Sequence, residues 1–487
     1  MYDDSVYQML HTVILFVIIC QHTGETIVNL KMLNTLSGQK EPFIANKTGE
    51  VSVYVCGVTL YDDIHIGHLK SIVSFEVIRN YFLAKGQNVK LVRNITDVDD
   101  KIIMKAEQLG VDPLDLVNSY IDKFHAVLEQ LQIPMPDIEP RVTQYLPEIS
   151  DYIEDLIENG TAYVTEDGVY FDTQKNKQER YPLSKKIVQD LDDNSRLDDK
   201  DYNKKHKADF ALWKLDKKYG YQSNVFTQQG RPGWHIECSV MHHHTLGEHF
   251  DIHGGGRDLI FPHHENEILQ SVAHNGINPA NYWLHNGMMT SDGKKLSKSL
   301  GNSIYVKDML TRYSGEALKL FLNKGQYNQS QEFKEDELQD AQIHWDNYVR
   351  DIPKYIFDEA DDNSYFEQAL NALEDDFNTP QVIIVLHEGF KQLRKSNSLS
   401  VAEDVLKIFK LLAVVPSEAT LETVYEKWMN EAEQPSAEVL DLVEKRQQAK
   451  LDKNYTLADS YRCQIKSLGW QVLDSGDTFE LRRIYLL

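Results

Sequence analysis

Residues 51–68 read VSVYVCGVTLYDDIHIGH, and this stretch decides the fold class. Its first six residues are mostly apolar and β-branched and end at Gly57, which predicts a short buried strand. Residues 69–83 carry apolar side chains at helical spacing, and residues 89–95 predict a second strand. A strand, a helix and a strand within about 45 residues form a βαβ unit. We therefore predict an α/β fold built on a Rossmann-like, doubly wound parallel sheet.

The motif His65-Ile66-Gly67-His68 follows the first expected strand and begins the expected helix. A helix N-terminus presents unpaired N–H groups and a positive dipole end, which together favour an anion. Gly67 lets a phosphate or an adenine approach the backbone, and the two imidazoles can donate to phosphate oxygens. By itself the motif could equally be a chance helix cap, and no P-loop sequence occurs in the chain.

A basic loop between two glycines is the second candidate phosphate-binding segment. Residues 294–299 read KKLSKS and lie between Gly293 and Gly301. A loop of this kind can bring Lys295 and Lys298 onto a triphosphate. In isolation, an ordinary solvated basic loop would explain the same sequence.

Four widely separated side chains have the chemistry of metal ligands. Zinc binds Cys, His and carboxylate donors in a tetrahedral set. His263 and Glu267 are four residues apart, so on a helix they would face the same way. Cys56, at the end of the first strand, and Cys238 could complete the set, although two buried apolar cysteines are the alternative. Other candidate ligands in this histidine-rich region are His264 and residues 242–244 (HHH).

Together these motifs resemble the class I aminoacyl-tRNA synthetases, in which HIGH is followed by a K-[ML]-S-K-S loop. Further blocks resemble the cysteinyl-tRNA synthetase family within that class, from about Met32 to the end of the chain. They are residues 56–62 (CGVTLYD), 94–101 (NITDVDDK), 233–241 (GWHIECSVM) and 250–267 (FDIHGGGRDLIFPHHENE).

The resemblance implies an enzyme that activates L-cysteine with ATP and transfers it to tRNA(Cys). It implies catalytic roles for His65, His68, Lys295 and Lys298. It implies ATP binding by His65, Gly67, His68, Gly255, Asp258 and Lys298. It implies substrate binding by Gly57, Thr96, Trp234 and His253. It also implies one zinc ion per chain on Cys56, Cys238, His263 and Glu267, with Mg²⁺ accompanying ATP.

Zinc is chemically reasonable for an enzyme that must separate cysteine from serine. Pocket shape alone separates such near-isosteres by only about 10–200-fold. A soft metal binds a thiolate in a way that a serine hydroxyl cannot match. We therefore expect no proofreading domain in this chain.

Composition and the resemblance together divide the chain into expected domains. Residues 1–31 are an N-terminal extension without a family counterpart, and their apolar run at 13–20 is too short to cross a bilayer. The expected parts after it are residues 32–147 (first half of the Rossmann catalytic domain), 148–229 (connective insertion), 230–280 (second Rossmann half), 281–335 (KMSKS-bearing stem-contact region), 336–435 (tRNA-binding helical bundle) and 436–487 (C-terminal anticodon-binding domain).

The formal net charge of −24 argues against a protein that wraps nucleic acid by neutralising phosphates. The acidity is uneven, because residues 330–443 hold 25 acidic and 9 basic side chains. Residues 290–324 and 444–487 carry net charges of +4 and +2, which leaves two basic regions for contact with tRNA. Four scattered cysteines do not form a disulfide framework, so we expect a cytoplasmic protein, and the family resemblance favours a monomer with no membrane partner.

Three positions depart from the family pattern, and three other functions share parts of it. The departures are Leu296 for Met, Val58 for Pro and Phe479 for Trp. The closest rival is a cysteine:amino-sugar ligase that shares the catalytic domain but lacks a full C-terminal part; residues 375–380 (DDFNTP) favour the synthetase. The other rivals are a short HxGH nucleotidyltransferase and a non-catalytic tRNA- or zinc-binding paralogue.

Overall fold

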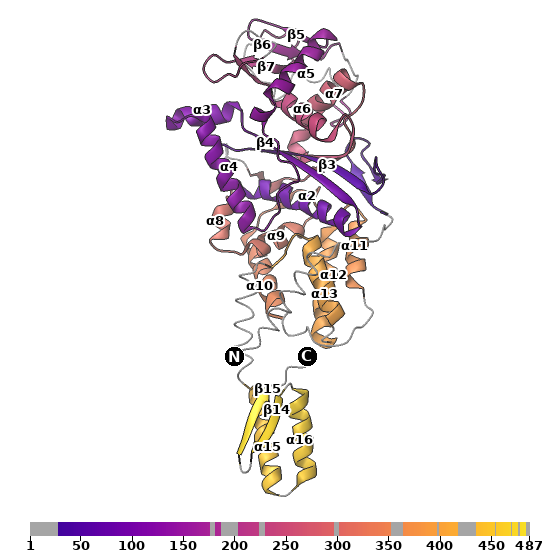
Figure 1. The fold of residues 1–487 in the computed structure, drawn as a ribbon, viewed down its shortest axis with the longest axis vertical. Coiled ribbons are helices and arrows are strands. Elements are labelled where there is room, and N and C mark those ends of the chain that lie inside the picture. The colour runs from indigo at the N-terminus through magenta and orange to yellow at the C-terminus, as the bar shows by residue number, and fades with distance from the viewer. Residues whose placement is uncertain are drawn as a thin grey trace.

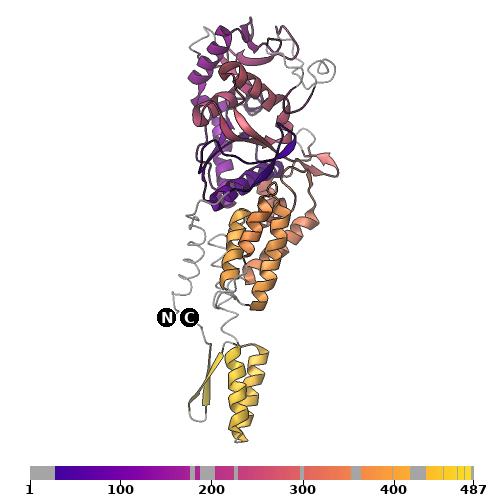
Figure 2. The same ribbon diagram turned by 90° about the vertical axis from the view of Figure 1, so that its right-hand side faces the viewer.

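The computed structural model describes residues 28–175, 181–186, 203–223, 229–296, 301–351, 364–396, 399–416, 435–452, 454–468, 470–475 and 478–483. Its helices and strands are arranged along a long axis, with β3 to β7 in the upper part, a helical bundle below them and a small C-terminal unit at the bottom (Figure 1). The same order is visible from the side, where the bundle is orange and the C-terminal unit is yellow (Figure 2).

A parallel four-stranded sheet forms the centre of the catalytic region. Its strands lie in the order β10-β9-β3-β4. Their bounds are β3 Glu50–Thr59, β4 Asn88–Thr96, β9 Phe250–Gly256 and β10 Ala280–Asn286. Helix α2, Ile66–Ala84, connects β3 to β4, so the predicted βαβ unit and the α/β class are confirmed.

The direction of strand addition reverses between β3 and β9. From β3 the chain continues to β4 on one side, whereas from β9 it continues to β10 on the other. In open parallel sheets, ligands bind outside the carboxyl ends of the strands at such a switch point. The end of β3, which carries Cys56, and the start of α2, which carries the HIGH motif, lie there.

A one-residue irregularity in β3 falls at Cys56 and Gly57. The register with β4 shifts between Val55 and Val58, which is a β-bulge that re-aims the side chains around it. A Cβ atom on Gly57 would lie 1.6 Å from the carbonyl oxygen of Asn94, so only glycine fits this position. The close packing of the two strands therefore depends on Gly57.

The insertion between β4 and β9 forms helices and a separate antiparallel sheet of order β5-β6-β7-β8. Its helices are α3 Asp100–Leu109, α4 Pro113–Gln130 and α5 Leu146–Glu158, with a 3-10 turn at Val142–Gln144. Its strands are β5 Ala162–Val164, β6 Gly168–Phe171, β7 Phe210–Leu215 and β8 Gly230–Pro232. The chain returns to the central sheet through α6, Trp234–Leu246. Helix α7, Glu265–Asn275, lies between β9 and β10 in the chain.

The remaining elements follow the central sheet in chain order. A three-stranded sheet of order β12-β11-β13 comprises β11 Met289–Ser291, β12 Lys294–Lys295 and β13 Gln331–Glu332, with α8 Val306–Leu310 and α9 Gly315–Asn323 between β12 and β13. The bundle comprises α10 Glu335–Asp351, α11 Tyr365–Leu373, α12 Thr379–Ser396 and α13 Leu399–Leu411. The C-terminal unit comprises α15 Ala437–Leu451, α16 Tyr455–Ser467, β14 Trp470–Ser475 and β15 Thr478–Arg483, and has its own small apolar core.

The fold begins before Met32, where the sequence placed the start of the catalytic domain. Strand β1, Lys31–Asn34, pairs with β2, Gln39–Pro42, and Leu30 packs in the main core. The Lys31 N–H also donates to the Glu374 carbonyl, and the Asp376 N–H donates to the Lys31 carbonyl, both at 2.8 Å. Glu374 and Asp376 lie just beyond α11. Most of the predicted extension, residues 1–27, lies outside the described residues.

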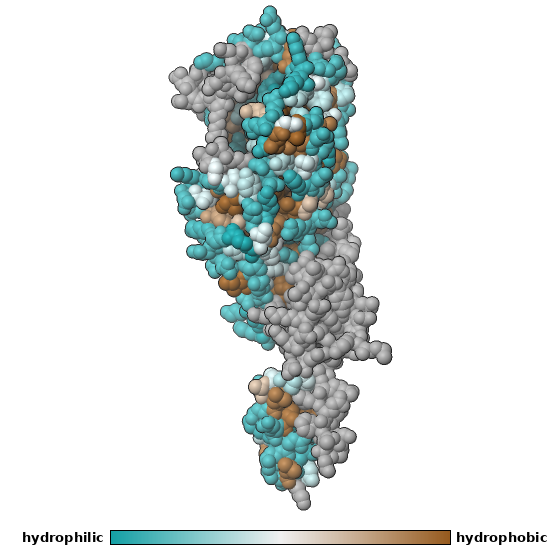
Figure 3. Space-filling model, turned by 90° about the vertical axis from the view of Figure 1, so that its left-hand side faces the viewer, coloured by the Kyte–Doolittle hydropathy of each residue, from teal (hydrophilic) through white to brown (hydrophobic). Residues whose placement is uncertain are grey.

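Hydrophilic residues cover most of the described surface on the face shown in Figure 3, with small hydrophobic patches between them. Within the part of the chain that the structure describes, no helix has both the length and the apolar character needed to cross a bilayer.

Asp376 connects the bundle to the catalytic region through a buried carboxylate. One of its oxygens accepts from the backbone N–H of Leu33 at 2.8 Å and from the Tyr327 hydroxyl at 3.3 Å. The other accepts from the Asn328 side-chain amide at 2.9 Å. Three donors from two other segments of the chain thus depend on one side chain that is 3% exposed.

We expect Asp376→Ala to lower the free energy of unfolding by about 2–4 kcal/mol, because it leaves buried donors without an acceptor. The adjacent Asp375 is the matched control, since its exposed carboxylate forms a surface ion pair of 2.6 Å with Lys40. Asp375→Ala should change stability by less than about 1 kcal/mol. Urea unfolding of both variants measures the difference, and equal losses would contradict the connecting role.

Candidate active site and metal centre

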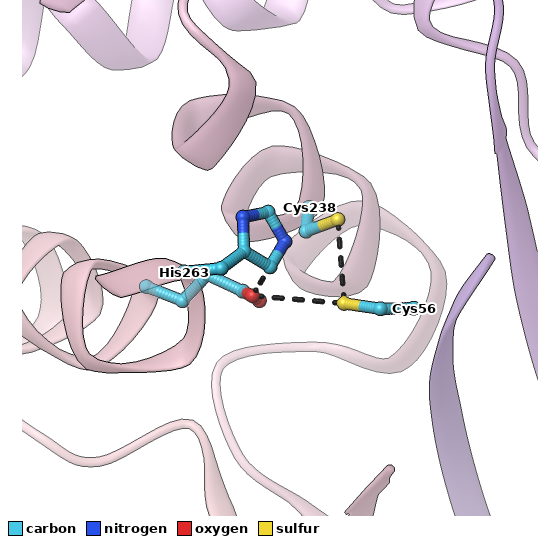
Figure 4. A group of neighbouring side chains, drawn as sticks. Cys56, Cys238 and His263 are labelled. Carbon is cyan, nitrogen blue, oxygen red and sulfur yellow. Dashed lines mark hydrogen bonds and ion pairs between the residues drawn. The ribbon is translucent and has the colours of Figure 1, made fainter. Parts of the chain in front are cut away.

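Four fully or nearly buried side chains converge on one point from three segments of the chain. They are Cys56 on β3, Cys238 on α6, His263 in the turn before α7, and Glu267 on α7. One ligand atom from each lies within 4.8 Å of all the others. Figure 4 shows Cys56, Cys238 and His263 pointing toward one another. The predicted ligand set is therefore brought together, and it forms a candidate metal site.

The donor spacing fits a tetrahedral cation. The Cys56 Sγ atom lies 3.6 Å from Cys238 Sγ and 3.6 Å from Glu267 Oε1, and His263 Nε2 lies 3.1 Å from the same oxygen. In a tetrahedral zinc site, with Zn–S near 2.3 Å and Zn–N or Zn–O near 2.0 Å, neighbouring donors are about 3.3–3.8 Å apart. The two distances from Cys56 lie within this range, and the distance between His263 and Glu267 is slightly shorter. Two thiols, one imidazole and one carboxylate are also donors that zinc accepts.

Burial makes the anionic forms of these donors costly without a cation. It raises the pKa of the Cys56 thiol, and it raises the pKa of the Glu267 carboxyl, well above the usual ranges. A bound cation removes that cost, because it takes the thiolate and carboxylate forms as ligands. The site is therefore suited to a metal rather than to a packed apolar core.

The segment that carries His263 differs from the regular helix that the sequence suggested. Residues Ile260–His264 form a π-type turn with a non-helical residue at Phe261, and α7 begins only at Glu265. The contact between His263 and Glu267 nevertheless forms, because the chain from His263 onward is helical.

A second set of side chains orients the ligands. His235 Nδ1 lies 3.0 Å from His263 Nδ1, and the Trp234 ring stacks on His263 with 4.1 Å between centroids. His253 Nε2 lies 2.8 Å from Glu267 Oε2. Contacts of this kind hold an imidazole or carboxylate in the geometry that a metal requires.

Of the alternative ligands, only His264 comes close to the cluster. A second group of possible donors comprises Cys56, His253, His264 and Glu267. His264 Nδ1, however, already lies 2.8 Å from His285 Nε2. His242, from the run at 242–244, is buried among aromatic rings and belongs to neither group among the described residues.

A cavity of about 470 Å³ connects the metal cluster to the HIGH motif. Its lining includes seven of the predicted site residues: Cys56, Gly57, His65, Gly67, His68, Trp234 and Asp258. Leu296 also lines it, at the position where the family usually has Met. Trp234 is 40% exposed, which fits a pocket wall better than simple core packing.

The two histidines of HIGH are held by the backbone of α2. His65 is the N-cap, and its Nδ1 accepts from the N–H groups of Gly67 at 3.1 Å and His68 at 3.3 Å. His68 Nδ1 in turn accepts from the His65 N–H at 3.3 Å, and the two rings stack with 3.7 Å between centroids. Because both Nδ1 atoms accept, each neutral ring carries its proton on Nε2, as a donor.

The basic loop is described only in part. Lys294 and Lys295 form β12, and Leu296 is buried against β11, where its N–H donates to the Met289 carbonyl at 3.1 Å. Lys298 lies outside the described residues, and the side-chain position of Lys295 is not described. Their proposed contacts with phosphate stay predictions.

Among the described residues with a predicted substrate- or ATP-binding role, three do not line the cavity. Thr96 is buried, with its hydroxyl 3.5 Å from Glu237 Oε2, and His253 is completely buried against Glu267 and Trp283. A Cβ atom on Gly255 would come within 2.8 Å of the His264 ring, so internal packing explains that glycine. Their roles in binding substrate or ATP stay predictions.

The sequence interpretation missed Asn94 and His235. The Asn94 side-chain oxygen accepts from the Gly57 N–H at 2.9 Å and lies 3.8 Å from Cys238 Sγ. His235 supports the ring of His263, as described above. Both occur inside blocks that resemble the family, but only the tertiary contacts show what they do.

Comparison with family models places most of the chain in a known group. Residues 42–343 match the model described as "tRNA synthetases class I (C) catalytic domain", and residues 368–415 match "DALR domain". Curated relatives named cysteine–tRNA ligase include one from Legionella pneumophila (strain Paris), 38% identical over 93% of this chain and 99% of its own length. Another, from Actinobacillus pleuropneumoniae serotype 5b, is 40% identical over 90% of this chain and 96% of its own.

Solved structures of low sequence identity share the fold. A Mycobacterium tuberculosis methionyl-tRNA synthetase in complex with methionyl-adenylate superposes with a TM-score of 0.55 at 13% identity, over 77% of this chain and 93% of that one. The LeuRS of an Agrobacterium radiobacter K84 ternary complex has a TM-score of 0.55 at 10% identity, over 79% and 86%.

We expect the stabilisation of this chain by a divalent cation, probed with Zn²⁺, to increase with pH. The raised pKa values of Cys56 and Glu267 mean that protons compete with the metal at low pH and are lost as pH rises. In the metal-free chain, Cys56 and Glu267 contribute stability at low pH that is lost as pH rises, whereas the lowered pKa of the third ligand, His263, acts in the opposite direction.

Thermal unfolding with Zn²⁺ and with chelator, at pH 6.5 and 8.5, measures the metal-induced stabilisation at each pH. Glu267→Gln is the control that should reduce the metal effect at both pH values. A metal-induced shift that is larger at pH 6.5 than at 8.5 would count against this site.

Proposed function

Because this chain belongs to the cysteine–tRNA ligase family of class I synthetases, we propose that it activates L-cysteine with ATP and transfers it to tRNA(Cys), using zinc to select the thiol. The observation that carries the proposal is that Cys56, from the metal cluster, and both HIGH histidines line one cavity. A cavity that joins a thiol-binding metal to a phosphate-binding helix terminus suits a reaction between cysteine and a nucleotide.

In the first step the cysteine carboxylate oxygen attacks the α-phosphorus of ATP. The new C–O–P bond forms cysteinyl-adenylate, and the bond to the β-phosphate oxygen breaks, so that pyrophosphate leaves. The Nε2–H groups of His65 and His68 donate to phosphate oxygens as charge builds up on them. Lys298 and Lys295 neutralise the departing pyrophosphate, with Mg²⁺ accompanying the nucleotide.

Other residues align the two substrates. The Asp258 carboxylate, on the cavity wall, accepts from the ribose hydroxyls, and Gly67 leaves room for the nucleotide at the helix terminus. Gly57 presents its backbone beside Cys56, and Trp234 closes the cysteine end of the cavity. Thr96 and His253 act from behind the cavity wall, Thr96 beside Glu237 and His253 on the ligand Glu267.

Cys56, Cys238, His263 and Glu267 would hold the zinc ion, which would supply a soft Lewis acid with a stronger preference for a thiolate than for a hydroxyl. The four ligands are held by packing and by the contacts of His235 and His253, so the site keeps its geometry when substrate enters.

In the second step the terminal ribose hydroxyl of tRNA attacks the cysteinyl carbonyl, and AMP leaves. The DALR match over 368–415 and the positive net charge of residues 444–487 support a tRNA contact by the bundle and by the C-terminal unit. We assign the anticodon end to that unit, and we assign the protein to the cytoplasm as a monomer.

We expect purified protein to charge tRNA(Cys) with radiolabelled cysteine in the presence of ATP and Mg²⁺. A cysteine:amino-sugar ligase would instead join labelled cysteine to an amino-sugar acceptor and leave tRNA uncharged. Charging assays with both acceptors, side by side, separate the two functions, and uncharged tRNA would refute the synthetase proposal.

We expect His68→Asn to lower the rate of cysteine-dependent ATP–pyrophosphate exchange by about 10²–10³-fold, because a donor to the reacting phosphate is displaced. The KM for cysteine should change far less. The matched control is His249→Asn, since His249 lies outside the cavity and bonds to Asn278 and Asn281. Exchange at the wild-type rate in His68→Asn would contradict the role of this histidine.

We expect Cys238→Ser to lose bound zinc and to discriminate less well between cysteine and serine. Cys463→Ser is the control, because that cysteine is exposed on α16. Elemental analysis should give about one zinc per chain in the control and much less in the variant. Exchange rates with cysteine and with serine then measure selectivity, and full selectivity without zinc would exclude the metal from thiol recognition.

A further inference from the structure

The segment that follows the KKLSKS motif pairs with the N-terminus of α2. The Ile66 N–H donates to the Ile304 carbonyl at 2.9 Å, and the Val306 N–H donates to the Ile64 carbonyl at 3.0 Å. These bonds surround an antiparallel bridge between His65 and Tyr305. The backbone of the first HIGH histidine is therefore attached to the chain a few residues beyond Gly301.

Two side-chain contacts reinforce this backbone pairing. The Tyr305 hydroxyl donates to Asp62 Oδ2 at 3.1 Å, and Lys307 Nζ donates to Asp63 Oδ2 at 2.5 Å. We call Asp62, Asp63, Tyr305 and Lys307 the 62–307 latch. None of the four lines the 470 Å³ cavity.

The opposite flank of the KKLSKS motif is attached to the cavity wall. Strand β12 pairs with β11, and Leu296 is 4% exposed and lines the cavity. One flank is thus fixed to the wall of the cavity and the other to the N-cap of α2. The contacts on both flanks fix the described residues on either side of 297–300 relative to the HIGH histidines.

We propose that the 62–307 latch positions the KKLSKS segment and the HIGH histidines relative to each other during adenylate formation. The proposal rests on the proposed function and names positioning residues for the same site. Groups that stabilise a transferring phosphoryl group act only when they are held in place, and a displacement of about 1 Å can cost about 10²-fold in rate. Two oriented contacts on the residues just before the N-cap provide that restraint.

The latch adds little to global stability. Lys307 is 54% exposed and Asp63 20%, and exposed ion pairs contribute weakly to folding. Its removal should therefore change rates and local backbone protection without unfolding the protein, which separates a positioning role from a general structural one.

The test compares the double variant Tyr305→Phe/Lys307→Gln with the control Lys47→Gln, which removes an exposed ion pair of similar length, 2.6 Å to Glu50, on another surface. We expect kcat for cysteine-dependent pyrophosphate exchange to fall about tenfold in the double variant. The KM for cysteine, the zinc content and the thermal midpoint should match those of the control. The charge-swapped variant Asp63→Lys/Lys307→Asp should recover more of the rate than Lys307→Asp alone.

A second readout does not depend on activity. Amide hydrogen exchange in peptides covering residues 60–70 and 301–310 should be faster in the double variant and unchanged in Lys47→Gln. The proposed role of the latch would be overturned by unchanged amide hydrogen exchange in both peptides or by an unchanged kcat. It would also be overturned by a loss of rate that is accompanied by loss of zinc or of thermal stability. Wild-type protein without cysteine-dependent exchange would refute the proposed function, whereas the amide measurement would still decide the latch.

Discussion

The parallel pairing of β3 with β9 is the interaction on which the rest of the structure depends. It aligns Val53 with Ile252, Tyr54 with His253 and Val55 with Gly254. The chain between these two strands contains α2, β4 and the insertion with its separate antiparallel sheet. A Cβ atom on Gly254 would lie 2.2 Å from the Phe75 ring of α2, so this glycine lets the helix pack onto the pair. The close packing of these three elements brings the ends of both strands to one edge.

The chemistry of the site follows from that packing. Cys56 comes from one of the paired strands, and the segment with His263 and Glu267 follows the other, so the two strands deliver three ligands to one place. Burial then raises the pKa of both Cys56 and Glu267, because their anionic forms are poorly solvated there. A bound cation compensates the free-energy cost of those anionic forms. The start of α2 lies at the same edge, which is why one cavity is lined both by Cys56 of the candidate metal site and by the two HIGH histidines.

Charge is arranged along the chain in a way that its net value conceals. The strongly acidic residues 330–443 include the bundle, whereas the segment around KKLSKS and the last residues of the chain are positive. An RNA partner responds to the local field of the surface it touches. Acidic helices beside basic regions would disfavour RNA that binds at the acidic surface. A net negative charge is therefore compatible with a tRNA substrate.

The sequence by itself determined the features that depend on residue type and local spacing. These are the βαβ unit, the HIGH motif at a helix terminus, and the identity of Cys56, Cys238, His263 and Glu267 as possible ligands. Only the tertiary structure decided that His253 supports Glu267, that Asn94 holds the bulge at Gly57, and that the HIGH motif pairs with residues 304–306. These contacts join segments far apart in the chain, and a local pattern carries no information about which distant side chain completes a hydrogen bond or fills a space.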